Sequence, residues 1–156
     1  MYSRKNEIKL DKIFKFEISE YTFGELTKEE LVECYKDGRV ASHFLERHLT
    51  KWFPELIHVK GCKDHDHVDK EGIKYDAKNF TSSSGLKFKP SAMIGTGRVF
   101  DAAKAHKKAD DLVYICCDIV DFPKVRVLFK KGSDLVIKYP KCEVPRSKRE
   151  DFFGQT

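Results

Sequence analysis

The sequence lacks a long hydrophobic run. Its longest unbroken apolar stretch, residues 112–117, is far shorter than the roughly 20 residues that a membrane-spanning helix needs. The first residues, MYSRKN, contain no apolar signal-peptide core. We therefore expect a soluble cytoplasmic protein with no membrane span.

Cysteine pairs are also missing. The chain has five cysteines, an odd number that gives no even disulfide framework. No CxxC pair occurs, which excludes a zinc ribbon with four cysteine ligands. We expect reduced and mostly buried thiols, as is usual in the cytoplasm. The cysteines are Cys34, Cys62, Cys116, Cys117 and Cys142.

No internal repeat, low-complexity tract or linker interrupts the chain. With 156 residues, of which 40% are hydrophobic, it fits one globular domain. This composition excludes a disordered or collagen-like chain.

Positive charge is in modest excess and lies mainly in the second half. Thirty Lys and Arg against 25 Asp and Glu leave a net charge of +5, which is compatible with a polyanionic partner. Solvated lysines on outward faces are the alternative interpretation. The basic residues are Lys87, Lys89, Arg98, Lys104, Lys107, Lys108, Lys124, Arg126, Lys130 and Lys131, followed by Arg146, Lys148 and Arg149.

The first half of the chain predicts two helices followed by strands. Thr27 and Glu30 form a capping box, which predicts a helix from there to Gly38. Apolar residues at helical spacing predict a second helix over 39–52. Residues 56–59 read as a short strand, and residues 73–80 as a strand whose side chains alternate between two faces.

The second half predicts a helix, a central strand and a hairpin. The helix is expected over residues 98–108 and the apolar strand over 112–120. Strands at 125–129 and 135–139 would flank a turn at Gly132. We expect an irregular basic tail from residue 140 to 156, and hence a core of about 27–140. The order of elements predicts a single α/β domain with a mixed sheet flanked by helices.

The chemistry is concentrated in residues 64–78, where acids crowd a loop before the alternating strand. If Asp66 ends one strand and Asp76 lies on its hairpin neighbour, their carboxylates can share a Mg²⁺ ion, with Mn²⁺ as an alternative. Lys78 lies on the same strand face as Asp76. It could hold or deprotonate an attacking water and offset charge on a phosphate in the transition state. These groups are the parts of a metal-dependent phosphodiesterase.

This pattern resembles the signature of the PD-(D/E)XK nucleases, an acid followed after a variable gap by acid-x-Lys. The stretch from Asp66 to Lys78 is most similar to small homodimeric type II restriction endonucleases of the PvuII kind, and the resemblance covers residues 64–80. It implies a restriction-endonuclease-like fold and a site-specific homodimer that cuts double-stranded DNA. It further implies that Asp66 and Asp76 are metal ligands and Lys78 the catalytic lysine, with Glu46 as an additional acid on the preceding helix.

Several assignments stay open at this stage. Asp64, Asp66 and Asp69 are all candidates for the first metal ligand. We expect DNA as the substrate, with RNA as the alternative. Polar and basic side chains after the strand are candidates for nucleic-acid contacts: Asn79, Ser82, Ser83, Lys87, Lys89 and Arg98.

Two other functions compete with this one. The stretch Asp64-His65-Asp66-His67 is similar to the histidine-rich motif of His-metal finger nucleases of the endonuclease VII type, in which a histidine is the general base. Those proteins also carry paired CxxC zinc ligands, which this chain lacks. The second alternative is a non-catalytic nucleic-acid-binding module that uses the basic second half.

Overall fold

The computed structural model describes residues 6–61 and 65–154. Its main sheet is mixed and has the strand order β1-β7-β6-β4-β3-β2. Strands β4 and β6 run parallel, and the other neighbours are antiparallel. The strands are β1 (Ile13–Glu17), β2 (Ile57–His58), β3 (His67–Val68), β4 (Lys74–Phe80), β6 (Leu112–Asp118) and β7 (Lys124–Lys131). A separate pair joins β5 (Leu86–Lys87) to β8 (Glu143–Val144).

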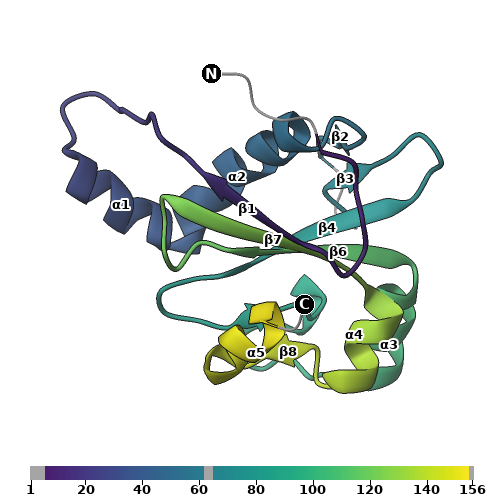
Figure 1. Ribbon diagram of the computed structural model, residues 1–156. Helices are drawn as coiled ribbons and strands as arrows, with labels where there is room; N and C mark the ends of the chain where they lie inside the picture. Colours follow the sequence, from purple (N-terminus) through teal and green to yellow (C-terminus); the bar gives the residue numbers. More distant parts are fainter. Residues whose placement is uncertain (1–5, 62–64, 155–156) are drawn as a thin grey trace.

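Helices cover both faces of this sheet (Figure 1). The helices α1 (Lys28–Lys36) and α2 (Gly38–Trp52) lie on one side. On the other side lie α3 (Ala102–Asp110), α4 (Gly132–Lys138) and α5 (Arg149–Gly154). Short 3-10 turns occur at Ser91–Met93 and Arg146–Lys148. The chain is thus a single mixed α/β domain, as the sequence predicts, and no helix in its described residues is long and apolar enough to cross a bilayer.

Alternation along the strands gives the sheet two separate cores. Tyr75 of β4 packs with Leu45 and Leu49 of α2 in the first core. Phe80 of β4 packs with Ala105 of α3 in the second core. Since successive side chains of a strand point to opposite faces, Tyr75 and Ala77 face α2, whereas Asp76 and Lys78 face the side of α3, α4 and α5.

The sequence signals for the N-terminal helices are local, and the structure confirms them. The Thr27 hydroxyl accepts a hydrogen bond from the Glu30 N–H, and the Glu30 carboxylate accepts one from the Thr27 N–H, which confirms the capping box. The predicted second helix is confirmed as α2, and the predicted strands 73–80 and 112–120 as β4 and β6.

The predicted C-terminal hairpin is wrong. Residues 132–138 form α4, and β7 pairs with β6 and β1 instead. Gly132 begins α4 against the backbone of Ala109, where a Cβ atom would collide, so close helix packing rather than a hairpin turn requires this glycine. The tail is not irregular either: it forms β8 and α5, and Phe152 and Phe153 are buried in the second core. The helix predicted over 98–108 begins only at Ala102, after the N-cap Asp101.

Candidate functional site

A tight turn between β3 and β4 sets the geometry of the site. The Asp69 carboxylate accepts hydrogen bonds from the N–H groups of Glu71 and Ile73, at 2.9 and 3.0 Å. It also accepts the hydroxyl of Tyr75 at 2.9 Å. Gly72 has a φ of +82°, a conformation that favours glycine. Asp69 therefore builds the turn, and its carboxylate is not left to hold a metal.

Asp66 is placed at the start of β3 by three hydrogen bonds. Its N–H donates to the Tyr75 carbonyl at 2.9 Å, and its own carbonyl accepts from the Val59 N–H at 2.9 Å. Its Oδ2 atom accepts the N–H of Ala77, also at 2.9 Å. This last hydrogen bond crosses the hairpin, so the Asp66 carboxylate lies next to β4 at Ala77, the residue after Asp76.

Asp76 and Lys78 meet on one face of β4. The Nζ atom of Lys78 lies 3.1 Å from Oδ2 of Asp76. Asp76 is 8% exposed, and Lys78 is half-buried. Burial raises the pKa of Asp76 to about 6, against the opposing effect of the Lys78 ammonium group. The nearby Asp66 carboxylate raises it further, through its charge and a shared hydrogen bond.

Asp66, Asp76 and Lys78 thus come together, as the sequence predicts. Two carboxyl groups that share a hydrogen bond repel each other when both ionise, and a proton or a cation relieves that repulsion. Their hard oxygen atoms suit Mg²⁺, which binds through one or two carboxylates and keeps several waters. Within the described part of the chain no group of three or more acidic, histidine or cysteine side chains is arranged to hold a metal. The residues therefore fit a hydrated Mg²⁺ ion rather than an enclosed protein cage.

Glu46 is not joined to these three residues. It lies on α2, on the opposite face of the sheet, and its Oε2 atom is 3.3 Å from Nε2 of His58. The Nδ1 atom of His58 lies 3.0 Å from Nη1 of Arg47. The helix position expected of Glu46 is present, but in this structure the carboxylate holds a histidine of β2.

The two histidines of the alternative motif have different surroundings. His67 is fully buried, and its Nε2 atom lies 3.2 Å from the backbone carbonyl of Glu46. Burial lowers the pKa of His67. Its Nδ1 atom has no hydrogen-bond partner within the described residues. His65 is half-buried just before Asp66. Asp64 and Cys62 lie outside the described residues.

The candidate nucleic-acid contacts are scattered. Asn79 faces the α2 side, and its Oδ1 atom is buried. Ser82 and Ser83 are exposed in the loop after β4, where the Ser82 hydroxyl donates to the Lys36 carbonyl at 3.3 Å. Lys87 is exposed on β5, Lys89 is 3.6 Å from the Glu143 carboxylate, and Arg98 donates to the Ser91 carbonyl. Asn79 lies on the opposite face of β4 from Asp76, whereas Lys87 and Lys89 flank Phe88, whose ring contacts Tyr114 on the Asp76 side of the sheet.

Two features of the structure were not predicted from the sequence. Tyr114 of β6 lies directly beside Asp76 in the sheet and is buried. Burial raises the pKa of Tyr114, and the Asp76 charge adds to the effect. No sequence signal separates Tyr114 from the other apolar residues of β6, since only the parallel register of β4 and β6 places it there.

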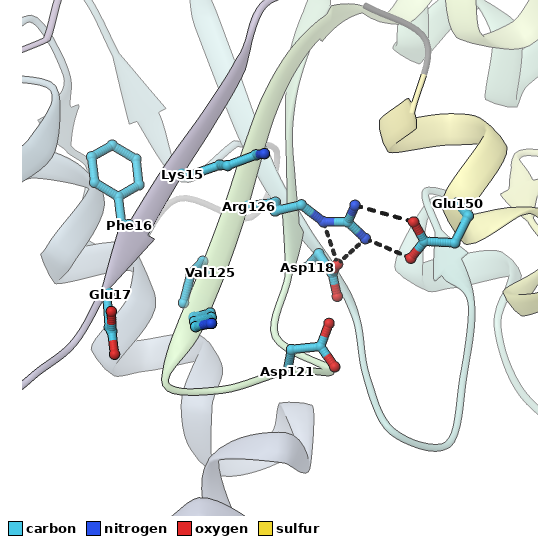
Figure 2. A pocket seen from close by; sticks show the side chains of 9 residues that line it. Lys15, Phe16, Glu17, Asp118, Asp121, Val125, Arg126 and Glu150 are labelled. Carbon is cyan, nitrogen blue, oxygen red and sulfur yellow. Dashed lines mark hydrogen bonds and ion pairs between the residues drawn. The ribbon is translucent and has the colours of Figure 1, made fainter.

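The second missed feature is a network of charged residues beside α5. Asp118 is 2% exposed and binds both Arg126 and Arg149. Figure 2 shows the Arg126 guanidinium group between Asp118 and Glu150, at the edge of a cavity of about 440 Å³. The charged groups of this network pair with one another. Arg149 and Glu150 of α5 bind Asp118 of β6 and Arg126 of β7, so the network attaches α5 to the sheet.

Comparison with models of known protein families, with curated proteins and with solved structures found no match. The geometry of the site therefore carries the functional argument.

Proposed function

We propose that this protein is a Mg²⁺-dependent endonuclease that hydrolyses phosphodiester bonds of double-stranded DNA. The observation that carries the proposal is the convergence of Asp66, Asp76 and Lys78 on one face of the β3–β4 hairpin. Its support is the spacing of these residues, which matches the acid and acid-x-Lys pattern of PD-(D/E)XK nucleases. A helix and an apolar strand, α3 and β6, follow the hairpin in the order expected of that pattern.

The residues would divide the work of hydrolysis. Asp66 and Asp76 would hold Mg²⁺, which when bound polarises the phosphate and lowers the pKa of a coordinated water. Lys78, steered by Asp76, donates hydrogen bonds to a non-bridging phosphate oxygen and offsets the charge that builds up as water attacks. The new P–O bond forms as the bond to the leaving sugar oxygen breaks. The attacking water loses a proton to solvent, and the leaving oxygen takes up a proton from solvent. The products are a phosphate monoester and a free sugar hydroxyl.

A homodimer that cuts at specific sites is part of this proposal. One domain of this size supplies one set of Asp66, Asp76 and Lys78, and two strands must be cut. Two copies related by a two-fold axis match the symmetry of a palindromic site. Sedimentation with and without duplex DNA tests this part: a dimer is expected, and a monomer in both conditions contradicts it.

We infer a cytoplasmic location from the thiols. Cys34, Cys116, Cys117 and Cys142 are free, and the last three are buried. Free thiols persist in a reducing compartment.

Incubation of supercoiled plasmid and a long mixed-sequence duplex with Mg²⁺, Mn²⁺ or EDTA tests the activity. Discrete fragments that need the metal would support a site-specific endonuclease, and relaxed circles or a smear a less selective one. DNA that stays intact in every lane would contradict the proposal. Binding that persists in EDTA without cleavage would instead favour the nucleic-acid-binding module.

A further inference from the structure

The helices α3 and α4 form a continuous surface on the Asp76 side of the sheet. Gly132 at the start of α4 touches the backbone of Ala109 near the end of α3. The ring of His106 on α3 is 2.7 Å, through Nε2, from the carbonyl of Pro140. The two helices lie side by side in Figure 1. The side chains around this contact therefore belong to one surface.

This α3–α4 surface is rich in lysines that have no acidic partner. Unlike Lys89, Lys130 and Lys148, which form ion pairs, none of its lysines pairs with a carboxylate in residues 6–61 or 65–154. The six are Lys104, Lys107, Lys108, Lys131, Lys138 and Lys141, and all are exposed except the half-buried Lys108. Against them stand the exposed Asp110, Asp111 and Asp134, so the surface carries a net positive charge.

Two lysines of this surface repel each other along α3. Lys104 and Lys108 are four residues apart on the helix, a spacing at which like charges destabilise a helix by a few tenths of a kcal/mol. An anionic partner would remove this repulsion. Lysines are compact point charges on flexible stems, which suits contact with phosphates more than reading of base edges.

A cavity of about 560 Å³ lies between this surface and the start of β4. Its charged lining residues are Lys74, Lys131, Asp110 and Asp111. Lys74 is exposed and lies two residues before Asp76 on β4. Residues two apart on a strand share a face, so Lys74 continues the positive charge toward Asp76.

We propose that the α3–α4 surface binds the sugar-phosphate backbone of the nucleic acid on one side of the bond that is cut. This inference rests on the proposed nuclease function. It assigns the surface that contacts the DNA backbone beyond the cleaved bond. Contacts to phosphates alone make this binding independent of base sequence.

Fluorescence anisotropy of a labelled duplex in EDTA, at several salt concentrations, tests the surface without cleavage. The variant Lys107→Gln/Lys131→Gln is compared with Lys28→Gln/Lys51→Gln, which removes two exposed lysines from α1 and α2. Each lost phosphate contact lowers the slope of log K against log salt by about 0.9. We expect a decrease of about 1.8 for the first variant, with at least tenfold weaker binding near 0.1 M salt, and little change for the second.

The outcomes separate this inference from the nuclease proposal. Equal slopes for the two variants and the wild type overturn the α3–α4 surface, even if the wild type cuts DNA. Equal losses in both variants overturn it as well, since binding would then follow net charge. A wild type that binds neither duplex nor single strands, and cuts neither, overturns both proposals.

Discussion

The Nζ atom of Lys78 lies 3.1 Å from Oδ2 of Asp76, so a carboxyl group that is itself nearly buried holds the lysine in place. Asp76 in turn contacts Asp66 from the other strand of the hairpin. This chain of contacts joins two acids and one cation across the β3–β4 hairpin. The proposed chemistry can therefore be tested at single residues.

Removal of the lysine should separate binding from cleavage. Lys78→Ala deletes the ammonium group but leaves Asp66 and Asp76 in place, and we expect a cleavage rate at least about 100-fold lower. Duplex affinity in EDTA should change by less than about tenfold, as expected for one phosphate contact. Single-turnover cleavage and anisotropy measure the two effects. Lys51→Ala, which removes an exposed lysine of α2, is the matched control. Wild-type cleavage by Lys78→Ala would show that the site is assigned wrongly.

The ionised Asp76 carboxylate should lower the free energy of unfolding at neutral pH. Its pKa rises from 3.8 to about 6 on folding, so the folded state binds more protons between these values. Stability from this group is therefore fully present below about pH 4 and is lost as the pH rises through 6. A shift of about two units corresponds to about 3 kcal/mol.

Asp76→Asn removes this dependence. We expect the variant to be more stable than the wild type at pH 8, by about 1–2 kcal/mol once the lost contact with Lys78 is counted. Below pH 4 the difference should disappear. Urea denaturation at pH 4 and pH 8 measures it. The same variant should not cut DNA, since the metal needs the carboxylate, and wild-type activity should decline below about pH 6. A less stable Asp76→Asn protein at pH 8 would contradict the assigned burial effect.

How much the sequence could predict depended on the range of the interactions. The capping box at Thr27 and the alternation along β4 are local, and both were predicted correctly. The turn acid Asp69 could not be told apart from Asp66 by sequence, because its role depends on the Tyr75 hydroxyl across the hairpin.

Long-range packing decided what the sequence did not predict. The strand β1 was not predicted, although Phe14 and Phe16 alternate with Lys15 and Glu17 as in a half-buried strand, and pairing with β7 completes it. Glu46 was placed correctly on a helix, but only the packing of α2 on the Tyr75 face decides that its carboxylate meets His58. In the same way, α5 depends on contacts of Phe152 and Phe153 with Phe80, which lies more than 70 residues earlier in the chain.

The Asp118 network should dominate the attachment of α5. Asp118 is 2% exposed and accepts Nε and Nη2 of Arg126 at 2.9 and 2.7 Å. Removal of one partner of a buried ion pair leaves a charge without full compensation, which costs about 3–5 kcal/mol. Because Arg149 still binds Asp118, we expect Arg126→Ala to lower the free energy of unfolding by about 2–3 kcal/mol.

Glu150→Ala provides the control for this network. The Glu150 side chain binds Arg126 at 3.0 Å but is 72% exposed, and exposed ion pairs contribute about 0–1 kcal/mol. Urea denaturation of both variants measures the difference. Similar losses for the two variants would contradict a buried charge at Asp118 as the main cause.

The last prediction concerns the two histidines and the competing nuclease mechanism. His67→Gln keeps an N–H donor for the Glu46 carbonyl but cannot accept a proton as imidazole does. In the proposed mechanism neither His67 nor His65 transfers a proton, so His67→Gln and His65→Ala should both retain cleavage to within a few-fold. His67→Ala should instead lose about 2–4 kcal/mol of stability, since it leaves a cavity where a fully buried ring was. Circular dichroism melts and cleavage rates separate the effects. A loss of 100-fold or more in His67→Gln or His65→Ala, with an unchanged melt, is the signature of a general base and would transfer the catalytic assignment from Lys78 to the histidine motif.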